Sequence, residues 1–478
     1  MLPVLWLLPG LLLSHGGRSQ DKWDLRRCVE YALANNISIK QADVQARLSK
    51  LTLDQSRLSQ IPTLGVGSGL GLNSGRSQNP NSYTLSTVTY LYNSYSAQSS
   101  VQLFNFFSLH NTIQANRYAW QAALAGSERT RNDLSLNVAN AYLQVLLATQ
   151  QAEAARLQLK LSQSQLEITR KQVNAGSLPE LNAAELEAQV AQDSSNYINL
   201  EGTIEQNVLQ LKAYIGMDAA TPFIVDTPPV EEIPLEQVAD LQPETVYALA
   251  LANQPLQKMD ALQVESARKS VLASKGAMYP NLTLSGSLSS SYVNQSSYGE
   301  VPYLFTDTVG RVVGSNAAVV NNHAIGATIV KVNAPAYFKQ LNQNFSQNLG
   351  LSLSIPIFNQ GVQRTNYARS KLNLRNTELQ RDQDNLTLKQ NIYQAYTSAM
   401  TALQKFEANK ISVAATQKSF DFAKKRSAVG MLNTIDYLTN QNNYFNAQIN
   451  LLISQFDYVF KMKVLEFYKG MGIKLTKE

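Results

Sequence analysis

Three histidines and one cysteine are the residues of this chain best suited to bind a metal or act as nucleophiles, and their positions favour neither role. His15, His110 and His323 lie far apart, in an apolar N-terminal region, at a hairpin–helix junction and in a loop, without the spacing of metal ligands. Cys28 has no second cysteine to pair with, and we interpret it as a small hydrophobic residue on an amphipathic helix. Residues 65–69 (GVGSG) are glycine-rich like a phosphate-binding loop, but they open a strand-like pattern that no helix follows. We therefore predict that the protein is not an enzyme and binds no cofactor or metal.

The composition argues against a set of ordinary soluble domains. Of the 478 residues 44% are apolar, but only 16% are charged, against roughly 25% in typical soluble domains. Uncharged polar residues, chiefly Gln, Asn, Ser and Thr, replace the missing charges, which suits a surface that faces other protein or a wet lumen. The net charge of +6 is spread along the chain without a basic stripe, so we predict no nucleic-acid partner.

Leu2–Leu13 is an apolar run followed by small and polar residues. This length is typical of a signal peptide and is too short to cross a bilayer as a helix. We predict that residues 1–20 direct export; the alternative is the buried start of a helix. No later segment reaches the ~18 uninterrupted apolar residues of a transmembrane helix, which leaves a soluble, a lipid-anchored or a β-barrel protein.

The chain is an internal duplication with a single step in its spacing. Matching residues of the two copies lie 218 positions apart in the first part of each copy and 254 positions apart in the rest. The difference of 36 residues is an insertion between residues 280 and 358. Because such a repeat decides the fold, we predict two structural repeats, residues 21–220 and 244–472, joined by a linker at 221–243 and followed by a tail at 473–478. The matching pairs include Ala34-Asn35 with Ala252-Asn253, Ile61-Pro62 with Tyr279-Pro280, and Phe104-Asn105 with Phe358-Asn359.

Each repeat predicts the same order of elements, namely helix, β-hairpin, long helix and helix. Helical patterns over residues 24–60 and 243–278 stop before prolines, because proline disfavours helix in the residue before it. Residues 63–104 and 281–358 alternate apolar and small polar side chains, which is the period of a β-strand. We expect the extra residues of the second copy to enlarge the loop of its hairpin.

Two proline-free stretches, about 109–175 and 363–429, predict very long helices. In each, apolar residues recur in alternating steps of four and three, as in a coiled-coil seam, at ten of twelve and nine of twelve positions. At 1.5 Å per residue such a helix is on the order of 100 Å long. Gly176 and Gly430 stand where a left-handed C-terminal cap belongs, so we predict helical turns near 176–180 and 430–434. The first seam consists of Leu134, Val138, Ala141, Val145, Ala148, Ala152, Ala155, Leu159, Ser162, Leu166, Thr169 and Val173, and the second of the residues 254 positions later.

Two hairpins supply four strands per chain, too few to close a barrel. Open sheet edges are not tolerated in lipid, so strands in a membrane would require several chains to share one barrel. The alternative is a soluble β-layer with ordinary core aromatics. Aromatic residues on and after the first hairpin would suit the interfacial girdles of a barrel: Tyr83, Tyr90, Tyr92, Tyr95, Phe104, Phe106 and Phe107.

The order of elements and several short sequences resemble the TolC family of outer-membrane efflux proteins over residues 22–472. The resemblance implies a mainly α-helical protein with a β-barrel part. It further implies a homotrimer in which a twelve-stranded barrel in the outer membrane is continuous with a long α-helical tunnel in the periplasm. It rests on the duplicated layout, both glycine-marked turns, residues 23–36 (WDLRRCVEYALANN), Ile61-Pro62, Tyr279-Pro280 and residues 356–359 (PIFN).

By this resemblance the protein is expected to be the exit duct of a tripartite efflux pump. It would passively conduct small toxic molecules, such as drugs, detergents or metal ions, out of a Gram-negative cell when docked to a periplasmic adaptor and an inner-membrane transporter. The exit duct of a type I protein secretion system is the alternative within the family. A structural coiled-coil envelope protein without a transport role, and an autonomous porin, are the alternatives outside it.

The resemblance also places acidic and polar residues just after the second helical turn around a closed periplasmic aperture. Asp436 occupies that position, and three copies around one axis would concentrate negative charge and favour cations. An acidic residue in the first turn of a helix can instead simply stabilise the helix dipole. Asn182, the repeat equivalent of Asp436, and Thr439 stand where the family carries acids, so a double carboxylate gate is not preserved. Glu180 is a further candidate.

The same resemblance assigns the helical turns to contact with the adaptor. We expect Leu178, Met431 and Leu432 to be exposed, because apolar residues at a turn then mark an interface. The alternative is that they pack locally as hydrophobic caps. The full set of candidates is Gly176, Ser177, Leu178 and Pro179 in the first turn and Gly430, Met431, Leu432 and Asn433 in the second.

Overall fold

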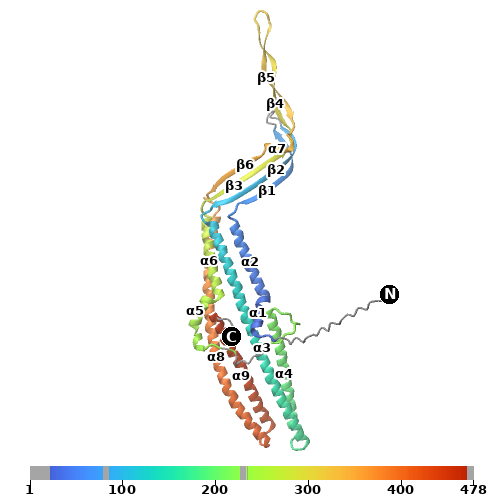
Figure 1. The fold of residues 1–478 in the computed structure, drawn as a ribbon, viewed down its shortest axis with the longest axis vertical. Helices are drawn as coiled ribbons and strands as arrows, with labels where there is room; N and C mark the ends of the chain where they lie inside the picture. The colour runs from blue at the N-terminus through green and yellow to red at the C-terminus, as the bar shows by residue number, and fades with distance from the viewer. Residues whose placement is uncertain (1–21, 79–84, 227–232, 234, 471–478) are drawn as a thin grey trace, which may run out of the picture. The chain divides into compact units, whose positions relative to one another are not determined.

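The computed structural model describes residues 22–78, 85–226, 233 and 235–470. The predicted signal peptide, the predicted tail and Tyr83 lie outside these residues. The chain forms two compact units, one helical and one that contains the β-sheets, and each draws on both predicted repeats (Figure 1). The duplication is therefore not a pair of spatial domains. The helical unit comprises Met1–Thr52, Asn116–Ala267 and Leu372–Glu478, and the β unit comprises Leu53–Ala115 and Arg268–Lys371.

The protein is mainly helical, and its two longest described helices are the two that the seams predict. Helices α3 and α8 each contain 67 residues. No residue of either seam is exposed, which confirms that the four-three pattern marks the buried face of each helix. The helices are α1 (Leu25–Asn35), α2 (Ile37–Leu58), α3 (Ser108–Asn174), α4 (Glu180–Ile215), η2 (Val238–Leu241), α5 (Pro243–Asn253), α6 (Pro255–Gly276), α7 (Tyr337–Gln343), α8 (Val362–Ala428) and α9 (Thr434–Lys469).

The helices predicted at 24–60 and 243–278 are each broken once, for a reason that both repeats share. Asn36 and Gln254 leave the helical conformation, with ψ angles of 134° and 131°. The side-chain amide of Asn36 donates a hydrogen bond to the carbonyl of Tyr214 over 2.8 Å. The amide of Gln254 donates to the carbonyls of Phe467 and Tyr468 over 3.1 and 3.2 Å. In both repeats the amide thus satisfies carbonyls at the C-terminal end of the last helix, where a helix leaves such groups unpaired.

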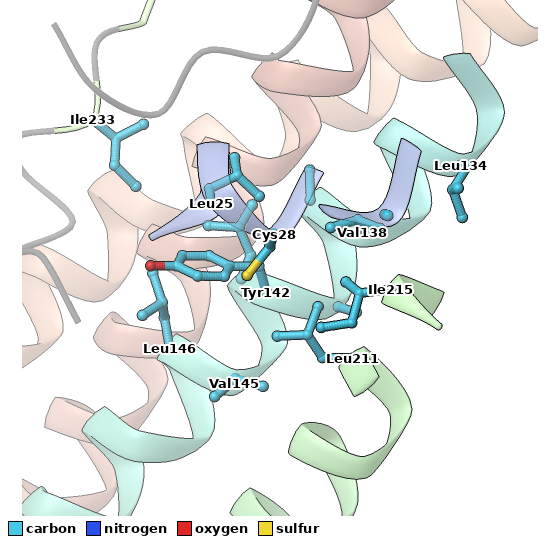
Figure 2. Packing of buried hydrophobic residues seen from close by; sticks show 14 of the residues in the cluster. Leu25, Cys28, Leu134, Val138, Tyr142, Val145, Leu146, Leu211, Ile215 and Ile233 are labelled. Atoms are coloured by element: carbon cyan, nitrogen blue, oxygen red, sulfur yellow. The ribbon is translucent and has the colours of Figure 1, made fainter. Parts of the chain in front are cut away.

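Buried side chains of α1, α3 and α4 form an apolar core in the helical unit (Figure 2). Val138, Tyr142 and Leu211 are each at most 1% exposed. Cys28 is fully buried among them, which confirms its interpretation as a small hydrophobic residue, and this burial raises the pKa of its thiol to about 12. The hydroxyl of Tyr142 donates to the carbonyl of Asp226 over 2.6 Å and so attaches the start of the predicted linker to α3.

In the β unit, four strands form one antiparallel sheet in the order β1-β2-β3-β6 (Figure 1). The extra residues of the second repeat are not a loop, contrary to our expectation, but a second two-stranded sheet and the short helix α7. Strands β4 and β5 pair antiparallel in this second sheet, although Pro302 and Leu304 interrupt a strict period-two pattern. The strands are β1 (Thr63–Gln78), β2 (Leu85–Phe104), β3 (Asn281–Val293), β4 (Ser297–Arg311), β5 (Ala318–Val332) and β6 (Ser346–Ser354).

Candidate functional site

The turn between α3 and α4 is closed by a glycine in the left-handed conformation. Gly176 has a φ of 74°, which favours glycine over residues with a side chain. Its N–H donates to the carbonyl of Val173 over 2.8 Å. The N–H and the hydroxyl of Ser177 both donate to the carbonyl of Gln172, over 2.9 and 2.8 Å. Pro179 is the N-cap of α4 and stands just before its first turn.

The turn between α8 and α9 repeats this geometry. Gly430 has a φ of 73°, and the N–H of Met431 donates to the carbonyl of Arg426 over 2.9 Å. Asn433 is the N-cap of α9, and its side-chain oxygen accepts the N–H of Asp436 over 2.7 Å. The two glycine caps are therefore confirmed, and Asn433 has a structural role that does not depend on any partner.

The four predicted aperture residues fall into two classes. Asp436 and Glu180 are exposed in the first turns of α9 and α4, where acidic groups also complement the helix dipole. Thr439 is exposed, and its hydroxyl donates over 2.8 Å to a carbonyl one turn earlier in its own helix. Asn182 is half-buried, and its amide donates to the hydroxyl of Thr434 over 2.6 Å. The structure thus connects the two hairpin turns of one chain through Asn182 and leaves both carboxylates at the surface.

Of the three apolar turn residues that we expected to be exposed, one is exposed and two are not. Met431 is 71% exposed, as expected of an interface residue. Leu178 and Leu432 are instead half-buried, so the expectation that they are exposed is wrong for both. Leu432 packs against a cluster around Tyr437 and Leu438, to which all four long helices of the turns contribute. It therefore acts as a hydrophobic cap, the alternative considered from the sequence.

A buried polar network behind the turns escaped the sequence analysis. The hydroxyl of Ser162 in α3 donates to Asp193 in α4 over 2.5 Å, and the amide of Gln189 donates to the other carboxylate oxygen over 2.8 Å. Asn442 in α9 donates to Gln189 over 3.1 Å, and Gln441 donates to Ser162 over 3.4 Å. Ser162 and Gln441 are at most 1% exposed. Ser162 could have predicted this network, because it is a polar residue in a mostly apolar seam. A polar group that is buried requires hydrogen-bond partners.

The four-stranded sheet of the β unit has one polar and one apolar face. Successive side chains of a strand point to opposite faces, so the pairing register assigns each side chain to a face. The polar face carries the odd-numbered residues of β1 and β3 and the even-numbered residues of β2 (up to Gln102) and β6, mostly Gly, Ser, Thr, Asn and Gln. On the opposite face the side chains of Leu64, Val66 and Leu349 are 78%, 82% and 79% exposed. The apolar face carries Leu64, Val66, Leu70, Leu72, Leu91, Leu282, Leu284, Leu288, Leu349, Leu351 and Leu353.

The register also corrects the expectation for the aromatic residues. Tyr90 and Tyr92 lie on the polar face, so they cannot belong to a girdle on the apolar face. Tyr95 lies on the apolar face, where its hydroxyl is 2.7 Å from that of Tyr337 in α7. Phe104 joins the apolar face through a register shift that follows Gln102. The sequence alone could not separate these tyrosines, because it does not show which set of alternating residues faces which side.

None of the helices in the described part of the chain is both long and apolar enough to cross a membrane. Comparison with known protein families gives the decisive observation. The family model described as "Outer membrane efflux protein" matches residues 28–217 and 246–458, one segment in each repeat. The chain belongs to the outer membrane efflux protein family. The resemblance inferred from the sequence is thereby confirmed.

Individual relatives agree with this assignment. The chain is 21% identical to the outer membrane protein TolC of Escherichia coli K12 over 96% of its own length and 84% of that protein. It is 24% identical to the alkaline protease secretion protein AprF of Pseudomonas aeruginosa, over 73% of its own length and 64% of AprF. Its fold is similar to that of the Campylobacter jejuni CmeC outer membrane channel, with a TM-score of 0.73 at 16% identity, covering 95% of this chain and 87% of that one.

Membership in this family settles the class of activity and the location. The family description names outer membrane efflux, and the names of the two relatives describe an outer membrane protein and a protease secretion protein. The protein is therefore an outer-membrane channel protein and not an enzyme, as predicted from the sequence.

Proposed function

We propose that the protein is the exit duct of a tripartite efflux pump, a homotrimer that conducts small toxic molecules through the outer membrane. The observation that carries the proposal is the sheet of the β unit, with one polar face, one exposed apolar face and two edges that no described strand pairs with. An apolar face of this kind is suited to lipid, and a polar face to a water-filled lumen.

The two edge strands of the sheet are suited to pair with each other between chains. Strand β1 begins directly after α2 and runs away from it, whereas β6 runs back toward α8. The two strands are therefore antiparallel, and β6 of one chain can continue the antiparallel sheet onto β1 of the next. Neither outer edge is paired with another strand in the described part of the chain. Three chains with four strands each would close a twelve-stranded barrel, which leaves no unpaired edge in lipid.

The turns of the helical unit are the proposed periplasmic tip, by analogy with the family. There the exposed carboxylates of Asp436 and Glu180 would surround the aperture in three copies. The exposed side chain of Met431, with the adjoining turn residues, would contact the hairpin tips of an adaptor protein, which connects the duct to an inner-membrane transporter. The hydrogen bond between Asn182 and Thr434 supports a closed resting tip, because it holds the two turns of one chain together.

A type I protein secretion duct is the second candidate, supported by the similarity to AprF, whose name describes secretion of an alkaline protease. The structural envelope protein without transport, considered from the sequence, is overturned by the family assignment. An autonomous porin is disfavoured by the connected turns, since a closed tip requires a partner that opens it.

Deletion of the gene from its host, followed by measurement of drug, detergent and metal susceptibility, tests the efflux function. We expect the deletion to increase susceptibility and the reintroduced wild-type gene to restore resistance. Purification of the native complex then identifies the transporter that delivers the cargo. Unchanged susceptibility together with loss of a secreted protein would contradict the efflux proposal in favour of secretion.

A further inference from the structure

The polar face of the four-stranded sheet carries no charged residue along the described strands β1, β2, β3 and β6. Hydroxyl groups dominate it, as in the paired residues Ser94 and Ser291, Ser96 and Ser289. The one charged residue in these four strands, Arg76, belongs to the alternating set of the apolar face. In the trimer proposed above, this face surrounds the part of the conduit that crosses the membrane.

Uncharged hydroxyl and amide groups solvate cations and anions alike. A serine hydroxyl both donates and accepts hydrogen bonds, and an asparagine or glutamine amide does so with separate atoms. Among side chains, it is rings of charged groups that select between cations and anions in a channel, such as carboxylates for cations or lysines and arginines for anions. A lumen lined by this face has water-like groups and no such ring.

The two tyrosines of the polar face do not change this property. Tyr92 is paired with Gly71, and a β-carbon at Gly71 would lie 2.5 Å from atoms of the Tyr92 side chain. The absence of a side chain at Gly71 therefore lets the tyrosine lie against the sheet. Tyr90 accepts a hydrogen bond from the amide of Asn73 over 3.1 Å. Both tyrosines add neutral, amphipathic surface to the face.

We propose that the β-lined part of the conduit does not discriminate between solutes by charge, so that its cargo comprises hydrated or amphipathic molecules of either sign. This inference rests on the proposed function. Any selection by charge then belongs to the helical turns with their exposed acidic residues, or to the transporter that supplies the cargo. Molecules as different as an organic cation and an anionic metal-binding product would pass this section equally well.

Cysteine reactivity in intact cells tests the proposal without requiring an open tip. A Ser287→Cys variant places one thiol per chain on the polar face, and Cys28 stays inert because it is fully buried. Two methanethiosulfonate reagents of similar size, one with a quaternary ammonium and one with a sulfonate, are added outside the cells. Each reaction rate of the Ser287→Cys thiol is divided by the rate of the same reagent with a free thiol. We expect the two corrected rates to agree within about threefold, well below the roughly tenfold ratio that a charge preference of about 1.4 kcal/mol would produce.

Two companion variants make each outcome decisive. Adding Ser285→Asp beside the thiol should favour the cationic reagent by roughly tenfold or more, which shows that the assay senses charge in this lumen. A Leu288→Cys variant places the thiol on the apolar face and should react slowly with both reagents. A charge preference above about tenfold with Ser287→Cys alone would overturn the inference and leave the proposed channel intact. Equal or faster reaction at Leu288 than at Ser287 would instead overturn the proposed orientation of the barrel.

Discussion

The side-chain amide of Asn182 in α4 donates a 2.6 Å hydrogen bond to the hydroxyl of Thr434 in α9. Its position in the repeat suggested an aperture residue equivalent to Asp436. The structure instead pairs it with the other helical turn of the same chain, so the asymmetry between the repeats has a physical consequence. At the equivalent position of the two repeats, α9 carries the exposed acid Asp436, and α4 carries the amide of Asn182 that holds the two turns together.

Removal of this contact should loosen the tip. In an Asn182→Ala variant we expect a higher single-channel conductance in planar bilayers, because the lost hydrogen bond stabilises the contact by about 0.5–1.5 kcal/mol. Thr434→Ala should have the same effect, and the double variant should add little to either. Thr439→Ala is the matched control, since its hydroxyl bonds only within its own helix. A control variant that conducts as well as Asn182→Ala would contradict this role.

Asp436 should determine how strongly cations bind at the aperture. In the proposed homotrimer, three such carboxylates near one axis would attract a trivalent cation added on the tip side, so we expect such ions to block the wild-type current. Asp436→Asn should weaken the block by roughly tenfold or more, measured as the concentration for half-maximal block. Glu180→Gln serves as a comparison at the other turn. Equal block of the wild type and Asp436→Asn would place the aperture elsewhere.

The buried network around Asp193 should stabilise the helical unit. Asp193→Ala leaves the buried hydroxyl of Ser162 without its acceptor and removes the nearer acceptor of Gln189. A buried unsatisfied polar group costs about 1–3 kcal/mol. We expect a lower melting temperature of the purified protein. Asp457→Ala, at a partly exposed ion pair with Lys461, should change it little. Similar melting temperatures for both variants would show that the network is dispensable.

Asp260 in α6 should make stability depend on pH. It is 3% exposed, and one of its carboxylate oxygens has no hydrogen-bond partner in the described residues. Burial and then the nearby Asp384 raise the pKa of Asp260 to about 6 from 3.8, while Arg129 and Arg381 lower it. Because of this raised pKa, the folded state retains a proton on Asp260 that the unfolded state releases. The free energy of unfolding therefore decreases as the pH rises from about 4 to 6.

The Asp260→Ala variant tests this dependence, since the equivalent residue of the first repeat is Ala42. Relative to the wild type, its melting temperature should rise between pH 4 and pH 6. Melting curves of both proteins across this range measure the difference. A difference that stays constant with pH would show that Asp260 does not titrate there.

Periodicity made much of the fold predictable, because long stretches follow a single rule. The four-three pattern identified α3 and α8, and alternation located the strands. The break at Asn36 was hidden in a continuous helical pattern, since it accompanies a hydrogen bond from the side-chain amide of Asn36 to the carbonyl of Tyr214, far along the chain. The strands of the inserted residues were not predicted because their apolar residues do not alternate strictly, as at Tyr303-Leu304-Phe305.

The candidate site was predictable only where local geometry decides it. Gly176 and Gly430 adopt the left-handed caps that their positions indicated. The burial of Leu432 and the pairing of Asn182 with Thr434 depend on how two helical hairpins pack together. Sequence spacing carries no information about that packing.

In the proposed homotrimer, three chains close one barrel through pairing of β1 with β6 of a neighbouring chain. Within one chain these strands are separated by β2 and β3, about 14 Å, which is too far for a disulfide. Disulfide formation between a cysteine at Gly65 or Gly67 and one at Ser352, in a Cys28→Ala background, therefore measures contacts between chains. We predict that oxidation in the membrane gives covalent dimers and trimers and nothing larger. Only monomers with both cysteine pairs, or a ladder of products beyond three chains, would contradict a closed barrel of three chains.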